Sequence, residues 1–225
     1  MNYYRVITYN VYWKNMKYKP ECVKNINLLL NNKFNTNNLG DFIFLQESAN
    51  RKKLLKNLDS NFNIINYTSG KETITTLINK KYTIIQKLGG QFMSGRPFLI
   101  VLLNNNICLI NVHLPHSNDL MKELTKIEKY LENSKINLKN YRIIMGGDFN
   151  IEINNKITFM NKKLTHTKDL FSCCSEYYDK SKFTKKYDYI LDSNNKIKGR
   201  LLYPKLRNII LPASDHFGVY AKLLK

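Results

Sequence analysis

The sequence predicts an α/β fold in which two mixed β-sheets pack together and helices lie outside them. Strand-like runs outnumber helical segments, and hairpins occur alongside helices. A doubly wound parallel sheet would instead show a strict alternation of strands and helices. The chain has 225 residues, of which 43% are hydrophobic. This length and composition favour a single domain spanning residues 1–225 with a sizeable core.

The expected strands are short hydrophobic runs bounded by turn-forming residues. Asn104, Asn105 and Asn106 separate two of these runs and indicate a hairpin between them. The runs are Tyr4–Tyr9, Phe42–Leu45, Ile64–Tyr67, Thr73–Ile78, Thr83–Leu88, Phe98–Leu103, Ile107–Val112, Arg142–Met145, Tyr187–Leu191 and Val219–Leu223.

Helical spacing of hydrophobic residues predicts three helices, at Glu21–Leu30, Arg51–Leu58 and Asp119–Leu138. Pro20 stands where a proline opens a helix. In the third helix one face is formed by Leu120, Leu124, Ile127 and Leu131. No run approaches about twenty consecutive apolar residues, so a transmembrane segment is not expected.

The charge of the chain predicts a polyanionic partner. Lys and Arg number 36 against 17 Asp and Glu, which gives a net charge of +19. Such a chain is attracted to nucleic acid or anionic lipid, and the attraction should fade with salt. An AT-rich genome is the alternative explanation for the many lysines, but it does not explain the scarcity of acidic residues.

The four cysteines favour a reducing, intracellular location, in cytoplasm or nucleus. No C-x-x-C pair occurs, and the adjacent Cys173 and Cys174 have a poor spacing for a zinc site. Cys108 lies in an apolar run, where a free thiol fills the core. The first ten residues contain no basic-then-apolar leader, so no signal peptide is expected.

Polar residues follow several of the expected strands directly, at the place where α/β enzymes usually carry their chemistry. Each has a structural alternative when taken alone, since Glu47 could cap a helix, Asp148 could belong to a turn, and His113 could lie at a sheet edge. The residues are Asn10, Gln46, Glu47, His113, Asp148, Asn150, Asp215 and His216.

Taken together, six motifs in this order resemble the endonuclease/exonuclease/phosphatase superfamily, the DNase I-like phosphoesterases. The motifs are Y-N-V (9–11), L-Q-E (45–47), N-V-H (111–113), G-D-F-N (147–150), Y-D-Y-I-L (187–191) and S-D-H (214–216). The resemblance implies a four-layered sandwich of two packed sheets flanked by helices. The S-D-H-F-G ending is similar to the tyrosyl-DNA phosphodiesterase branch, with Phe217 where that branch usually has Trp.

The resemblance implies hydrolysis of phosphate esters with Mg²⁺ (or Mn²⁺), a hard ion that prefers oxygen ligands. By position, the metal residues would be Glu47, Asn10 and Asp215.

The catalytic residues that the resemblance implies are Asp148, Asn150, His216, Asp188 and His113. Asp148 would orient or deprotonate the attacking water, and Asn150 would contact the phosphate. His216, oriented by Asp188, would stabilise the transition state or transfer a proton. His113 would add a second donor to the phosphoryl oxygens.

The predicted function is a metal-dependent phosphodiesterase that acts as a monomer on nucleic acid, either DNA or RNA, as a nuclease or a DNA-end-processing enzyme. Arg96, Tyr12 and Phe217 are the predicted substrate contacts. Related abasic-site endonucleases and tyrosyl-DNA phosphodiesterases typically have an acidic residue after the first motif, whereas here Tyr12 and Trp13 follow it. The alternatives are a phospholipid or inositol-phosphate phosphoesterase and an inactive nucleic-acid-binding module.

Overall fold

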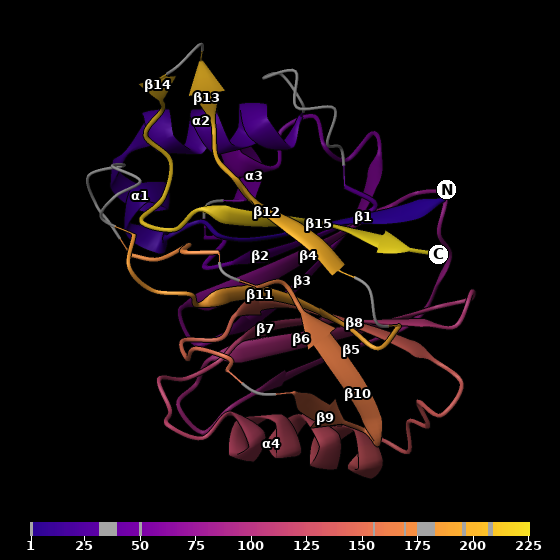
Figure 1. The fold of residues 1–225 in the computed structure, drawn as a ribbon. Coiled ribbons are helices and arrows are strands. Elements are labelled where there is room, and N and C mark those ends of the chain that lie inside the picture. The colour runs from indigo at the N-terminus through magenta and orange to yellow at the C-terminus, as the bar shows by residue number, and fades with distance from the viewer. Residues whose placement is uncertain are drawn as a thin grey trace.

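Two β-sheets pack face to face in the computed structural model, and helices cover the outer surface of each sheet (Figure 1). The structure describes residues 2–31, 40–49, 51–154, 156–168, 170–174, 183–194, 197–206 and 209–225. The arrangement is the predicted four-layered sandwich.

The first sheet consists of β1 (Tyr3–Asn10), β2 (Phe42–Gln46), β3 (Phe62–Ser69), β4 (Glu72–Asn79), β12 (Ile197–Leu202) and β15 (Gly218–Leu224). Their order is β12-β15-β1-β2-β4-β3. Strand β1 runs parallel to β2, and every other neighbouring pair is antiparallel. As a result, β1 and β2 end at the edge of the sheet where β15 and β4 begin.

The second sheet consists of β5 (Ile84–Gln91), β6 (Pro97–Leu103), β7 (Ile107–His113), β8 (Arg142–Asp148), β9 (Ile157–Phe159), β10 (Lys162–His166) and β11 (Asp188–Asp192). Their order is β5-β6-β7-β8-β11-β10-β9, with β7 parallel to β8 and the other pairs antiparallel. The ends of β7 and β8 therefore lie beside the start of β11. A separate small ribbon pairs β13 (Lys205–Leu206) with β14 (Ile209–Ile210).

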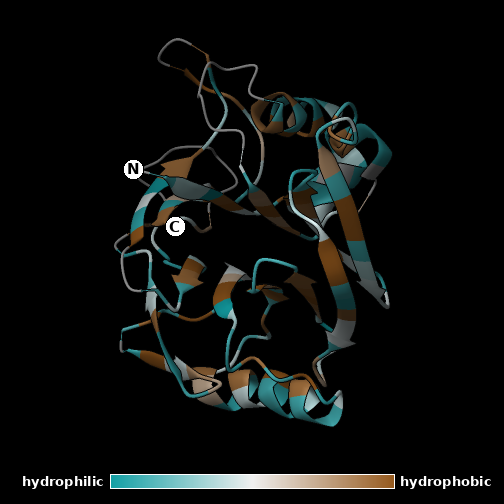
Figure 2. Cartoon of the chain, turned by 90° about the vertical axis from the view of Figure 1, so that its right-hand side faces the viewer, coloured by the Kyte–Doolittle hydropathy of each residue, from teal (hydrophilic) through white to brown (hydrophobic). Residues whose placement is uncertain are grey.

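The helices lie on opposite outer faces of the sandwich (Figure 1). On the first sheet are α1 (Trp13–Tyr18), α2 (Pro20–Leu30) and α3 (Arg51–Leu54), and on the second is α4 (Leu120–Asn133). Asp119 caps α4 by accepting a hydrogen bond from the Lys122 N–H at 3.0 Å. Hydrophobic and hydrophilic residues both occur along α4 (Figure 2), and its buried side meets the sheet. None of the described helices is long and apolar enough to cross a membrane.

Three hydrophobic layers hold the sandwich together because each sheet is covered on both faces. Successive residues of a strand enter different layers, so Val6 packs between the sheets and Ile7 packs under α2. Gly146 of β8 lies against the ring of Phe44 from β2, and a Cβ there would come within 2.4 Å of that ring. The missing side chain thus lets β2 and β8 approach closely, at the end that carries the polar residues.

The ten expected strands and the Asn104–Asn106 hairpin are present. Two helices are shorter than predicted: the one expected to reach Leu58 ends at Leu54, and α4 ends at Asn133. Asn57 and Lys135 adopt left-handed backbone angles, φ 67° and 56°, which do not continue a helix. The prediction missed α1, β9, β10, β12, β13 and β14, which are short or lie at exposed edges without a clear hydrophobic period.

Candidate active site

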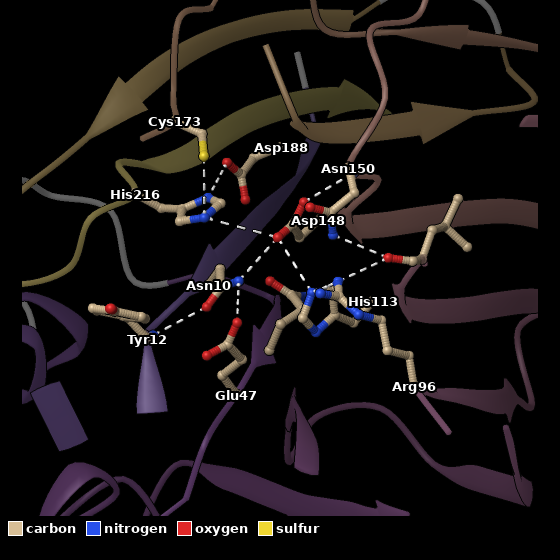
Figure 3. A network of polar contacts seen from close by, with 12 residues as sticks. Asn10, Tyr12, Glu47, Arg96, His113, Asp148, Asn150, Cys173, Asp188 and His216 are labelled. Carbon is tan, nitrogen blue, oxygen red and sulfur yellow. Dashed lines mark hydrogen bonds and ion pairs between the residues drawn. The ribbon is translucent and has the colours of Figure 1, made fainter. Parts of the chain in front are cut away.

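The predicted polar residues meet at one edge of the sandwich because of the strand directions (Figure 3). Two parallel pairs of strands, β1 with β2 and β7 with β8, end there, and β11 and β15 begin there. Asp148 lies directly between His113 of β7 and Asp188 of β11 in the sheet register. The edge brings together Asn10, Glu47, His113, Asp148, Asp188, Asp215 and His216.

Asp148 is at the centre of the network. Its Oδ2 accepts a hydrogen bond from Asn10 Nδ2 at 2.9 Å and lies 3.4 Å from His113 Nε2 and 3.8 Å from His216 Nε2. Its Oδ1 accepts from the backbone N–H of Asn150 at 3.0 Å. One buried carboxylate thus faces two imidazoles from different strands, which suits a group that handles protons.

Asn10 links Asp148 to Glu47 through its amide nitrogen, which also donates to Glu47 Oε1 at 3.1 Å. The amide oxygen accepts from the Tyr12 N–H at 3.0 Å, and this contact sets the orientation of the amide. Asn10 therefore turns its nitrogen, and not its oxygen, toward the carboxylates. In this orientation the amide nitrogen of Asn10 donates to both carboxylates.

Glu47 and Asp215 are the oxygen donors that fit a divalent cation. Glu47 has a left-handed backbone, φ 54°, and its Oε2 accepts from the Trp13 N–H at 3.0 Å. Burial, together with the charges of Glu47 and Asp148, raises the pKa of Asp215 to about 6, although His216 lowers it. A cation with a preference for carboxylates, such as Mg²⁺, would relieve this repulsion.

Asp188 holds His216 by accepting a hydrogen bond from Nδ1 at 2.7 Å. Burial alone would lower the pKa of His216, but the charges of Asp188, Asp148 and Asp215 outweigh it and raise that pKa to about 10. His216 is therefore an imidazolium at neutral pH, with Nε2 directed toward Asp148.

The pKa of His113 is shifted in the opposite direction to that of His216. Burial is the main cause that lowers its pKa to about 4, and the nearby charge of Arg96 lowers it further. Its Nε2 contacts the Arg96 guanidinium and its Nδ1 contacts Glu72. Because a guanidinium can only donate, Nε2 accepts and Nδ1 carries the proton.

Glu72 also belongs to the site, through its contact with His113, and is not among the predicted site residues. Burial raises its pKa to about 7, opposed by Arg96. It belongs to none of the six motifs, and only its position at the start of an expected strand could have indicated that it lies at the site. It directly precedes the run Thr73–Ile78 and is the first residue of β4, the antiparallel partner of β2, which begins where β2 ends.

The three predicted substrate contacts are placed differently. Arg96 is half-buried, touches His113 and donates to the Leu114 carbonyl at 2.9 Å. Tyr12 lies at the border of the network, where its N–H donates to the amide oxygen of Asn10 (Figure 3). Phe217 is 2% exposed, and its ring stacks on that of Phe183 with the ring centroids 3.8 Å apart, so it is not placed to contact a substrate.

Beside Glu47 lies a cavity of about 490 Å³ whose walls come from the loops next to the site. Trp13, which is 44% exposed, forms one wall, and Lys71, Glu72 and Arg96 contribute to the others. The cavity thus combines an exposed aromatic ring with two cationic side chains.

Cys173 and Cys174 form a disulfide, whereas Cys22 and Cys108 are buried and take no part in it. Cys173 Sγ lies 3.3 Å from His216 Nε2, so the pair borders the candidate site (Figure 3).

No family model matches the sequence. An uncharacterised protein of Acanthamoeba polyphaga mimivirus is 29% identical over an alignment 266 residues long, and the alignment covers 98% of this chain. The chain spans about half the length of that curated relative, 50%.

Solved structures resemble the chain over nearly its whole length. TDP2 from Caenorhabditis elegans matches 100% of this chain and 75% of its own with a TM-score of 0.74 and 16% identity. TDP2 from D. rerio, complexed with a single-strand DNA product, matches 99% of both chains with a TM-score of 0.69 and 15% identity. An endonuclease/exonuclease/phosphatase family protein from Leptotrichia buccalis matches 99% of this chain and 100% of its own, with a TM-score of 0.67 and 19% identity.

Proposed function

Because the chain has the endonuclease/exonuclease/phosphatase fold, we propose that it is a metal-dependent phosphodiesterase that hydrolyses nucleic acid. The observation that carries this proposal is the position of Asp148, whose Oδ2 lies between Nε2 of His113 and Nε2 of His216. Glu47 and Asp215 lie next to it as donors for Mg²⁺ or Mn²⁺.

In the proposed reaction Asp148 orients the attacking water and accepts its proton. His216 enters as an imidazolium and donates a hydrogen bond from Nε2 to a phosphoryl oxygen, while Asp188 holds its other nitrogen. Arg96, in contact with His113, supplies a second positive charge to the phosphoryl oxygens. Glu47 and Asp215 would hold the metal, which would supply positive charge to neutralise the phosphate.

The choice of nucleic acid as substrate rests on three features. The net charge of +19 attracts a polyanion. The cavity beside Glu47 combines Trp13, on which a base can stack, with Lys71 and Arg96, which can pair with phosphates. The D. rerio TDP2 structure that shares the fold contains a single-strand DNA product.

The test is cleavage of end-labelled DNA and RNA oligonucleotides, including a 5′-tyrosyl end and an abasic site, in Mg²⁺. We expect cleavage that disappears in EDTA and in Asp148→Asn, and product lengths that reveal endo or exo action. Trp13→Ala should weaken binding of single strands and leave the fold intact, since its ring is exposed. A folded protein that cleaves none of these substrates would refute the proposal. Hydrolysis of phospholipid vesicles or inositol phosphates would then support the lipid alternative.

A further inference from the structure

A second set of donor atoms borders the candidate site on the side away from Glu47. Cys173, Cys174 and His216 each offer one ligand atom, and these atoms lie within 4.8 Å of one another. Cys173 and His216 are buried, whereas Cys174 is exposed. We propose that the reduced cysteine pair and His216 form an inhibitory Zn²⁺ site, distinct from the magnesium site.

The geometry of Cys173 and His216 suits zinc. Their Sγ and Nε2 atoms are 3.3 Å apart (Figure 3). A tetrahedral zinc with usual Zn–S and Zn–N bond lengths separates two such ligands by about 3.5 Å. The pair therefore needs only a small adjustment to hold one ion.

The surroundings of His216 resemble those of a zinc-binding histidine. Its Nδ1 donates to Asp188 at 2.7 Å, which directs Nε2 toward the sulfur, and such a carboxylate partner commonly orients metal-bound imidazoles. The carboxylate of Asp148 lies 3.8 Å from the same Nε2 and adds negative charge beside the ion.

The donor types separate this site from the one at Glu47. Two thiolates and an imidazole are soft to borderline ligands and select Zn²⁺, whereas Mg²⁺ prefers carboxylate oxygens. Adjacent cysteines alone are a poor zinc motif, and the third ligand, His216, which lies 42 residues from Cys174 in the sequence, completes the set. Occupation would remove Nε2 of His216 from the proposed reaction, so the inhibitory role rests on the proposed function while the binding does not.

The disulfide between Cys173 and Cys174 closes this site, and reduction opens it. A phosphine reductant supplies two electrons to the S–S bond and takes the oxygen of one water, whose two protons go to the sulfurs. Zn²⁺ then replaces both thiol protons and the Nε2 proton of His216, which leave to solvent.

Binding is tested with Co²⁺ as a spectroscopic probe on the full chain, with Mg²⁺ in excess. The phosphine-reduced protein should bind one Co²⁺ with a thiolate charge-transfer band, and Zn²⁺ should displace it. Cys173→Ala and Cys174→Ser should each weaken this binding at least about 100-fold, because losing even an outer partner of a ligand typically costs roughly 10–100-fold. Cys22→Ala, at a buried thiol elsewhere, is the matched control and should bind as the wild type does.

The proposal fails if the reduced wild type shows no thiolate band, or if the band persists in both variants or in the oxidised protein. Circular dichroism shows whether Cys173→Ala and Cys174→Ser each fold. If one of them does not fold, cobalt binding by the other variant tests the site. In the cleavage assay, Zn²⁺ should inhibit the reduced wild type and spare Cys174→Ser. A cobalt band without any cleavage would leave the site intact and refute only the proposed hydrolase.

Discussion

Replacing Asp188 by Asn should lower the pKa of His216, because the change removes the negative charge that Nδ1 contacts at 2.7 Å. A hydrogen bond to a charged group contributes about 1.5–3 kcal/mol. At 1.36 kcal/mol per pKa unit this corresponds to about 1–2 units. From about 10 in the wild type, the pKa of His216 should fall to about 8–9.

The assay is an NMR titration of the His216 ring in EDTA. The matched control is Asp192→Asn on the same strand, whose carboxylate pairs with Arg142 and not with His216. The control should leave the pKa of His216 unchanged and lower the stability of the fold. A wild-type pKa near 6.5, or equal values in both variants, would refute the assignment of Asp188.

The raised pKa of His216 in the wild type also determines how the stability of the metal-free protein depends on pH. The pKa of His216 is raised from 6.5 to about 10 on folding, so the folded state binds the proton more tightly. The contribution of His216 protonation to the free energy of unfolding is complete below pH 6.5 and is lost as the pH rises through about 10. Urea unfolding across this range should show that loss in the wild type and a smaller one in Asp188→Asn.

Further outcomes follow from the other contacts. Asp148→Asn should reduce cleavage by about 10²–10⁴-fold while binding of an oligonucleotide persists, as a gel-shift assay would show. Glu72→Gln should lower kcat and alter the pH profile, because it changes the partner of the Nδ1 proton of His113, whereas a purely structural role would change only the melting temperature. Phe217→Ala should cost about 3–5 kcal/mol in unfolding free energy without a specific rise in KM, since the ring is buried away from any substrate. Oligonucleotide affinity should fall steeply between low and physiological salt, and a salt-independent affinity would contradict phosphate-based binding.

The strands and most of the candidate site could be predicted from the sequence because both are encoded locally. A hydrophobic run such as Ile107–Val112 forms a strand wherever both faces of a sheet are covered, and the residue after it, His113, lies at that strand's end. Elements without such a run, such as the edge strand Ile197–Leu202 with its largely exposed residues, left no comparable signal.

The sequence by itself determined which polar residues stand at the strand ends, and hence most of the chemistry available at the edge. Only the tertiary structure decided which of them touch. Asn10 reaches Asp148 across 138 residues, Glu72 meets His113 from another sheet, and Cys173 approaches His216. It also decided that Phe217 is buried. Such contacts depend on how two sheets pack and on side-chain direction, and spacing along one chain does not contain that information.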